Sequence, residues 1–275
     1  STEQIKAFSD LGINRISIGV QSLDDSSLQI LDRRHTAKRS IEAIHTSSDG
    51  GIDNISIDLM YELPEQTLQS WQHTLQMAES LPITHLSLYN LTFEPHTVFF
   101  KKKKELLPRV PAAETSLAML QEAVAVLEHI GLKRYEISAF AKAGFASRHN
   151  SGYWTARPFL GFGPSAFSYW DKKRYSNVSN LNQYSAALKK GLTAVDFEEL
   201  LPCPDSQKEL LAIELRLLRG VDLKNFQARH GNLPNEVLLN LELLQSKGWI
   251  ERDGTRIKLS PEGLLFYDSI GEILI

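Results

Sequence analysis

Two groups of side chains in this sequence have residue types suited to binding chemistry. The first contains the carboxylate of Asp58, near the end of the apolar run 54–61, and the amide of Gln21, at the end of the earlier apolar run 14–20. A carboxylate within an apolar strand needs a partner, because burial of an unpaired charge is costly. Asp58 is therefore either a ligand contact or a structural acid held by backbone N–H groups. Arg33, after a short helical pattern, is either a contact for an anionic group or a solvated cation.

The second group lies in segment 144–169, which is rich in glycine and aromatic residues. It contains His149, Asn150, Tyr153 and Trp154. One imidazole among flat apolar rings suits a flat aromatic ligand or a metal-centred macrocycle. The alternative is that His149 is a structural histidine that hydrogen-bonds the loop. Little helical periodicity is visible, and the segment is long for a connection, so we expect a functional loop.

Composition excludes several classes of protein. The net charge of −3 gives no electrostatic reason to expect nucleic acid as the main partner. No apolar run of membrane-spanning length and no signal-like N-terminus are present, so we expect a soluble, cytoplasmic protein without a transmembrane segment. Cys203 is the single cysteine, which excludes an internal disulfide and a cysteine-ligated cluster built from this chain alone.

Strand and helix patterns alternate along the first half of the chain. Apolar strand patterns are centred near residues 18, 57 and 88, and a fourth is expected over 135–140. Pro64 ends the second strand, and Thr67 caps a helix running to about residue 81. This alternation predicts a parallel βα array, either a barrel or part of one, with Gln21 and Asp58 at carboxyl strand ends, where ligands collect.

The C-terminal quarter has a different pattern. Helical patterns over 206–219, 222–230 and 234–247 precede a hairpin around Asp253-Gly254, and a last helix is expected from Pro261. Helices followed by a hairpin are typical of a winged helix. We therefore expect three regions: a βα region over 1–143, an aromatic and glycine-rich segment and linker over 144–203, and a winged-helix-like α+β domain over 204–275.

Several motifs resemble the radical S-adenosylmethionine (SAM) family of oxygen-independent coproporphyrinogen III oxidase-like proteins. They are NRISIGVQS (14–22), NISIDLMY (54–61) followed by LP and QT, LSLY (86–89) with EP (94–95), YEIS (135–138), RHNSGYW (148–154) and GFGP (161–164). They keep the family's order through nearly the whole chain. The HNxxYW pattern at 149–154 is similar to the HemW branch, whose members are heme chaperones rather than oxidases.

The resemblance implies roles for individual residues. Gln21, Arg33 and Asp58 fall where the family contacts SAM, and Met60 and Thr92 fall where it touches the adenosine part. Arg33 suits the methionyl carboxylate through a charge-assisted hydrogen-bond pair. His149, Asn150, Tyr153 and Trp154 fall in the motif associated with heme, with His149 as the candidate ligand of the heme iron.

The sequence also departs from the family. The CxxxCxxC loop that holds a [4Fe–4S] cluster is absent, so its ligands are expected upstream of Ser1 and the fold is expected to be a partial parallel βα barrel. The family's GLPGQT reads ELPEQT at 62–67, and its GPGAHSY reads GPSAFSY at 163–169. Two glutamates and one serine thus replace glycines, and Phe167 replaces a second histidine.

The resemblance favours one function among three. It implies a heme-binding and heme-insertion protein, whose intact form uses a [4Fe–4S] cluster and SAM and whose partner is a heme-accepting respiratory protein. The first alternative is coproporphyrinogen III oxidase, an enzyme of heme biosynthesis that performs oxidative decarboxylation. The second is a winged-helix nucleic-acid binder, which the acidic residues Glu236 and Glu242 disfavour. Whether the chain is an enzyme, and whether it is a monomer or a homodimer, stay open.

Overall fold

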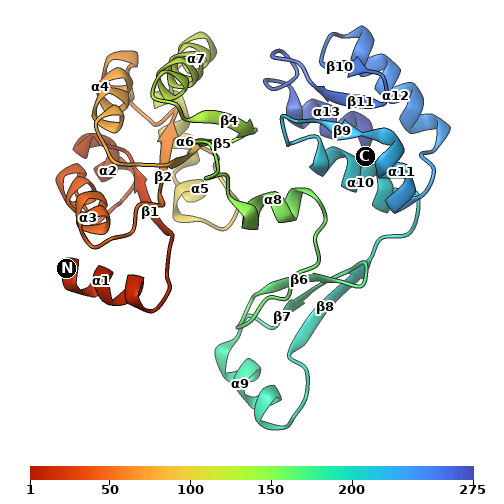
Figure 1. Ribbon diagram of the computed structural model, residues 1–275, viewed down its shortest axis with the longest axis horizontal. Helices are drawn as coiled ribbons and strands as arrows, with labels where there is room; N and C mark the ends of the chain where they lie inside the picture. Colours follow the sequence, from red (N-terminus) through yellow and green to blue (C-terminus); the bar gives the residue numbers. More distant parts are fainter. The chain divides into compact units, whose positions relative to one another are not determined.

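The computed structural model of the protein describes residues 1–275, with the exception of the side chain of Val98. Its internal contacts divide the chain into two units, Ser1–Ala146 and Ser147–Ile275 (Figure 1). Among the described helices, none is both long and apolar enough to cross a membrane.

The N-terminal unit is built on a five-stranded sheet of order β1-β2-β3-β5-β4. The strands are β1 (Ile16–Gln21), β2 (Ile55–Tyr61), β3 (His85–Asn90), β4 (Lys133–Glu136) and β5 (Ala139–Ala141). Strands β1, β2 and β3 are parallel, which confirms the expected α/β class. Within the described residues the sheet does not close into a barrel, because β1 and β4 each pair with only one other strand.

The expected single strand over 135–140 is wrong. The chain turns at Ile137-Ser138, so that β5 runs antiparallel to both β3 and β4. Local side-chain hydrogen bonds hold this turn: Arg134 Nε donates to the Ile137 carbonyl at 3.0 Å, and the Ser138 N–H donates to Glu136 Oε1 at 3.1 Å. These bonds compete with a continuing strand, and a hydrophobicity pattern does not register them.

One helix precedes the first strand of this unit, and the other helices lie between successive strands. They are α1 (Thr2–Asp10), α2 (Asp25–Ile30), α3 (Ala37–Asp49), α4 (Leu68–Glu79), α5 (Val98–Lys101), α6 (Lys103–Leu106), the 3-10 turn η1 (Leu107–Arg109) and α7 (Ala113–His129). The hydroxyls of Thr36 and Thr67 accept from the backbone N–H three residues on, as expected for N-caps. Asp24 caps α2 in the same way.

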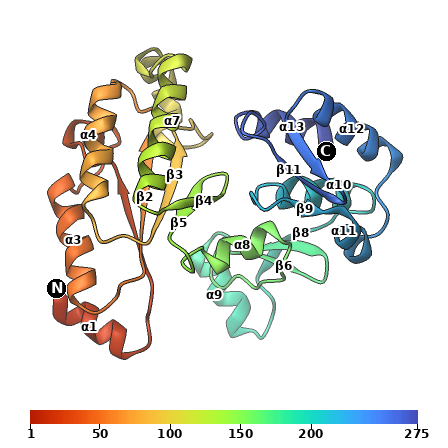
Figure 2. The ribbon, with the colours of Figure 1, turned by 45° about the horizontal axis from the view of Figure 1, so that its top comes forward.

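One face of the sheet is apolar and packs against α3, α4 and α7 (Figure 2). Ile55, Ile57 and Leu59 of β2 are fully buried there. Trp71 of α4 is also fully buried, and its indole N–H donates to the Met119 carbonyl of α7 at 2.8 Å. These contacts fix the helices on one side and leave the opposite face of β2 and β3 for polar side chains.

The C-terminal unit begins with a helix and a small sheet where a loop was expected. The elements are α8 (Arg148–Trp154), β6 (Phe167–Trp170), β7 (Lys173–Asn177), α9 (Leu181–Lys189) and β8 (Val195–Leu200), with antiparallel sheet order β6-β7-β8. The loop prediction over 144–169 is wrong for two reasons. Helix α8 spans only seven residues, too few to show helical periodicity, and its N-cap is Ser147. Strand β6 is short and rich in aromatic residues, which suits a pleated surface.

The rest of this unit has the expected winged-helix pattern. It contains α10 (Asp205–Glu214), β9 (Val221–Asp222), α11 (Leu223–His230), α12 (Asn235–Ser246), β10 (Ile250–Asp253), β11 (Arg256–Leu259) and α13 (Tyr267–Leu274), with sheet order β10-β11-β9. The last helix begins at Tyr267 and not at Pro261. Residues 261–265 form turns because Gly263 packs against the Trp249 carbonyl and its N–H is held by Ser260 Oγ at 2.9 Å.

Three residues that replace family glycines keep a glycine-like backbone. Glu62, Glu65 and Ser165 have φ values of 64°, 63° and 59°. The left-handed region costs an L-residue roughly 1–2 kcal/mol. Glu65 recovers part of this cost, since its carboxylate accepts from Nε and Nη2 of Arg109 at 3.1 and 2.7 Å.

We expect Glu62→Gly to raise the free energy of unfolding by about 0.5–1 kcal/mol. Glycine removes the backbone strain at φ 64°, which stabilises the folded state. Part of this stabilisation is lost because glycine also makes the unfolded chain more flexible. Urea unfolding followed by circular dichroism measures the change. The control is Glu62→Ala, which removes the same carboxylate and keeps the strain. Equal stability of the two variants would contradict the prediction.

Candidate functional site

The first candidate site is the polar face of the N-terminal sheet, defined by Ser56, Asp58, His85 and Ser87. Side chains alternate across a strand, so these residues point away from the apolar face. The parallel register of β2 and β3 places Ser56 beside His85, and Asp58 beside Ser87. Four polar side chains of two adjacent strands therefore meet on one surface.

A chain of hydrogen bonds crosses this polar face. The Ser56 hydroxyl lies 2.8 Å from His85 Nδ1, and His85 Nε2 lies 2.9 Å from the Tyr135 hydroxyl of β4. Burial, with a smaller contribution from the charge of Arg15, lowers the pKa of His85 to about 4. The imidazole is thus neutral at pH 7, with one nitrogen donating and the other accepting. It ties β2 to the β4–β5 hairpin across β3.

Asp58 lies in the middle of the polar face. The expectation that it stands at the carboxyl end of its strand is wrong, since β2 continues past it to Tyr61. Burial raises the pKa of Asp58, while a hydrogen bond from Ser87 and the charge of Arg15 act in the opposite direction. The Arg15 guanidinium is itself fixed, because Nη1 donates to Asn54 Oδ1 at 2.8 Å. Ser87 and Arg15 thus offset only part of the cost of burying the Asp58 carboxylate, which is the situation expected of a carboxylate that contacts a ligand.

The other residues assigned to SAM differ in where the structure places them relative to the polar face. Met60 shares the face of Asp58, two residues nearer the carboxyl edge. Gln21 is the last residue of β1 and has a left-handed backbone, with φ 67°. Its side-chain nitrogen would lie 2.8 Å from a Cβ at Gly19, so the glycine leaves room for the amide. Thr92 is exposed just after β3.

Arg33 is not joined to this group. It is exposed between α2 and α3, and the groups that act on the Asp58 carboxylate within the described part of the chain are Ser87 and Arg15. Sequence reasoning also missed Arg15, His85 and Tyr135. The available signal was the repeated polar residue at every second position, Ser56 with Asp58 and His85 with Ser87.

The second candidate site is a cavity of about 330 Å³ in the C-terminal unit. We call it the α8 cavity, because Tyr153 and Trp154 of α8 form part of its wall. Its other lining residues include Arg157, Phe159, Phe167, Tyr169, Lys172, Arg174, Glu199, Gln207, Glu209, Arg229 and His230. The volume is at the lower end of the range for small-molecule pockets, and the wall combines aromatic rings with charged groups.

The four residues assigned to heme divide between the cavity and the surface. Tyr153 and Trp154 line the cavity, whereas His149 and Asn150 do not. His149 is exposed, and its Nε2 lies 2.7 Å from the Tyr153 hydroxyl. The ring of Tyr153 contacts the rings of both His149 and Phe159, with centroid separations of 4.7 and 4.6 Å. Aromatic contacts therefore connect the imidazole to the cavity wall.

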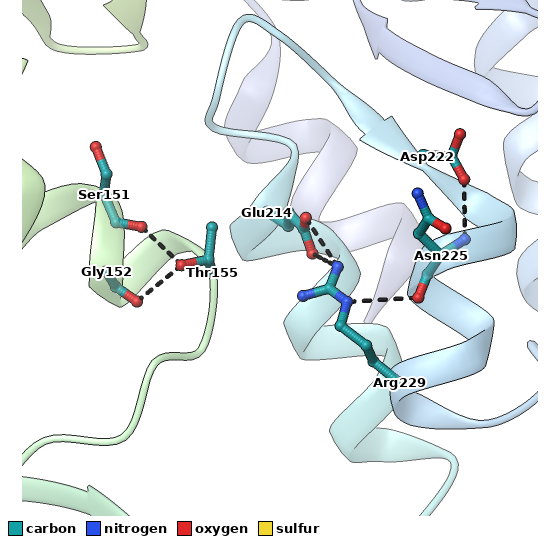
Figure 3. A network of polar contacts seen from close by, with 7 residues as sticks. All are labelled: Ser151, Gly152, Thr155, Glu214, Asp222, Asn225 and Arg229. Atoms are coloured by element: carbon teal, nitrogen blue, oxygen red, sulfur yellow. Dashed lines mark hydrogen bonds and ion pairs between the residues drawn. The ribbon is translucent and has the colours of Figure 1, made fainter.

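Figure 3 shows how the neighbouring polar groups are fixed. The Thr155 hydroxyl donates to the carbonyls of Ser151 and Gly152 at 3.0 and 3.3 Å, which closes the end of α8. Arg229 donates to both carboxylate oxygens of Glu214 at 3.1 and 2.9 Å. The charge of Arg229 is thus already paired inside the unit.

Comparison with known proteins gives the class of this fold. Residues 1–78 match the radical SAM superfamily, and residues 204–266 match the HemN C-terminal domain. A solved radical SAM enzyme, coproporphyrinogen III oxidase (HemN) of Escherichia coli, superposes with a TM-score of 0.83 at 21% identity, over 100% of this chain and 67% of its own. The parallel strands and the C-terminal module are therefore those of a radical SAM protein of the HemN type.

Curated relatives identify the family within this class of radical SAM proteins. The heme chaperone HemW of Bacillus subtilis is 32% identical over 98% of this chain and 72% of its own length, and HemW of Lactococcus lactis is 32% identical over 99% and 72%. The mitochondrial radical S-adenosyl methionine domain-containing protein 1 of Danio rerio is 37% identical over 97% and 63%. The chain belongs to the HemW family of radical SAM proteins, which confirms the resemblance drawn from its motifs.

Proposed function

We propose that this chain binds heme through α8 and its cavity and delivers it to an acceptor protein. The observation that carries the proposal is the aromatic wall of Tyr153, Trp154 and Phe159, which lies beside an imidazole in a chain whose relatives are named heme chaperones. Burial of only about 200 Å² of a flat macrocycle contributes about 5 kcal/mol before association costs. The acceptor we expect is a respiratory heme protein in the cytoplasmic compartment or facing it.

We also propose that the polar face holds SAM. The half-buried carboxylate of Asp58 and the amide of Gln21 suit ribose hydroxyls or the amino-acid end, and Met60 provides an apolar contact for the adenosine part. SAM supplies radical chemistry only together with a [4Fe–4S] cluster. The single cysteine among the 275 residues, Cys203, does not fit a three-thiolate cluster, so no radical step is assigned to these residues.

The oxidase alternative has less support than heme delivery. The likeness to the oxidase, at 21% identity, concerns the fold alone, whereas relatives at 32% identity are named heme chaperones. The residues that we assign to heme all lie in the C-terminal unit.

Titration of hemin into the wild type and two variants tests the heme proposal. We expect His149→Ala to change the Soret band of bound heme with less than about a threefold change in Kd, because the aromatic wall supplies most of the burial. We expect Trp154→Ala to raise the Kd by about tenfold, the effect of about 1.4 kcal/mol of lost contact.

A matched control is Trp170→Ala, since Trp170 is 52% exposed and lies outside the cavity. Trp154 also stacks against Arg216 at 4.4 Å, so the melting temperature of each variant is measured alongside the Kd. Non-saturable binding by the wild type would refute the proposal. Identical heme spectra for wild type and His149→Ala would remove His149 as the iron ligand and leave binding by the cavity.

A further inference from the structure

We propose that the α8 cavity receives the carboxylate-bearing edge of the macrocycle, with Arg157 and Lys172 pairing with its carboxylates. This inference rests on the proposed heme-binding function and adds the chemistry by which the ligand is oriented. The cavity, at about 330 Å³, suits part of a macrocycle and not the whole of it. Tyr153 and Trp154 belong both to α8 and to the cavity wall, so a ring lying on these residues extends into the cavity.

The charges of the cavity leave an excess of positive groups. Arg174 pairs with Glu199 at 2.5 Å and also with Glu209, so this cluster carries one net negative charge and uses up the charge of Arg174. Arg229 is held by Glu214. Arg157 and Lys172 line the same cavity, and the ion pairs of Glu199 and Glu209 within the described residues are made with Arg174 and with neither of these two cations. Two such cations beside an aromatic wall favour a ligand that carries carboxylates.

Gly152 gives Arg157 its position. A Cβ at Gly152 would lie 2.7 Å from the guanidinium carbon, so the Arg157 head group occupies the space that glycine leaves on α8. Alanine at this position would displace the guanidinium, which is the movable end of a long side chain. Because alanine is the stronger helix former, the substitution is compatible with an intact α8.

A buried donor points to the same ligand class. The indole N–H of Trp154 is buried and has no hydrogen-bond partner within the described structure, although it belongs to the cavity wall. Buried donors are rarely left unpaired, and a carboxylate oxygen is a strong acceptor for this group. Gln207, which is 2% exposed, has an unpaired Oε1 as well. That oxygen needs a donor, which a water bound between it and the carboxylate would supply.

His230 adds no charge to the cavity at neutral pH. Burial, followed by the charges of Arg229 and Lys172, lowers the pKa of its imidazole. The groups that attract an anion are therefore Arg157 and Lys172, and an imidazolium does not contribute. The proposed recognition consequently does not depend on the protonation of His230.

The test compares hemin with hemin dimethyl ester, which has the same ring and iron but no free carboxylates. Kd values are measured for the 275-residue chain in one dilute detergent by Soret titration. We expect the wild type to bind hemin at least tenfold more tightly than the ester. We expect Arg157→Met/Lys172→Met to reduce this ratio to less than threefold by weakening hemin binding, with the ester Kd unchanged.

Two further variants separate the effect of the position of Arg157 from the effect of positive charge in general. Gly152→Ala keeps both cations and is expected to reduce the ratio about threefold or more, by displacing Arg157. Lys190→Met removes an exposed cation outside the cavity and is expected to keep the wild-type ratio. If the double variant fails to fold, the two single substitutions and Gly152→Ala carry the test.

The outcomes distinguish this inference from the proposed function. Tight binding of both ligands with equal Kd would overturn the inference and leave heme binding intact. A wild-type ratio that persists in the double variant would also overturn it, by placing the carboxylates elsewhere. Binding of neither ligand would refute the proposed function itself.

Discussion

Trp71→Ala is expected to lower the free energy of unfolding of the N-terminal unit by about 3–5 kcal/mol. The indole is fully buried between the sheet and α7, and its ring lies 6.1 Å from that of Tyr61. The substitution creates a cavity and leaves the Met119 carbonyl without the indole N–H that now lies 2.8 Å away. Both losses act on the contact between α4 and α7, which holds the apolar face of the sheet.

Urea unfolding followed by far-ultraviolet circular dichroism measures this change. Trp71→Phe is the intermediate case, because it keeps a buried aromatic ring and removes the N–H with a smaller part of the ring. We expect a loss of about 1–2 kcal/mol. Trp170→Ala, at an exposed tryptophan, is expected to change stability by less than about 0.5 kcal/mol. A loss below about 1 kcal/mol in Trp71→Ala would show that α4 does not depend on this contact.

The second large effect is a pH-dependent loss of stability caused by His85. Its pKa is about 4 in the folded chain, against 6.5 for an exposed histidine. The unfolded chain therefore takes up a proton first as the pH falls, which favours unfolding. The stability is complete above pH 6.5 and falls between 6.5 and 4 by about 3 kcal/mol, at about 1.4 kcal/mol per pH unit. Below about pH 4 both states are protonated and this contribution stops changing.

The measurement is the free energy of unfolding at several pH values from 7.5 to 4, in the wild type and in His85→Asn. The asparagine amide keeps a hydrogen-bonding group near Ser56 but does not titrate. We expect the difference between the two proteins to change by roughly 2–3 kcal/mol over this range. Parallel pH curves for wild type and His85→Asn would mean that His85 is solvated and charged in the folded protein.

Local patterns predicted those elements whose signals are contained in a few neighbouring residues. The N-cap Thr67 and the parallel strands around residues 18, 57 and 88 follow from residue type and periodicity, and all are present. Elements whose form depends on side-chain hydrogen bonds or on short length were missed. The β4–β5 hairpin needs the bonds of Arg134 and Glu136, and α8 is too short for a periodic signal.

The sequence by itself determined the family and the class of the fold, because motifs record residue identity and order along the chain. The same motifs supplied the proposed assignment of residues to SAM and heme. Only the tertiary structure decided which of those residues meet. It brought Asp58 onto one surface with His85, Ser87 and Arg15, which are far apart in the sequence, and left Arg33 outside that group. It also enclosed Trp154 in a cavity with Lys172 and Gln207 while His149 stayed exposed. The physical reason is that hydrogen-bond partners, burial and excess charge depend on which groups are adjacent in space. Strand pairing and helix packing create these adjacencies, and the spacing of residues along the sequence does not specify them.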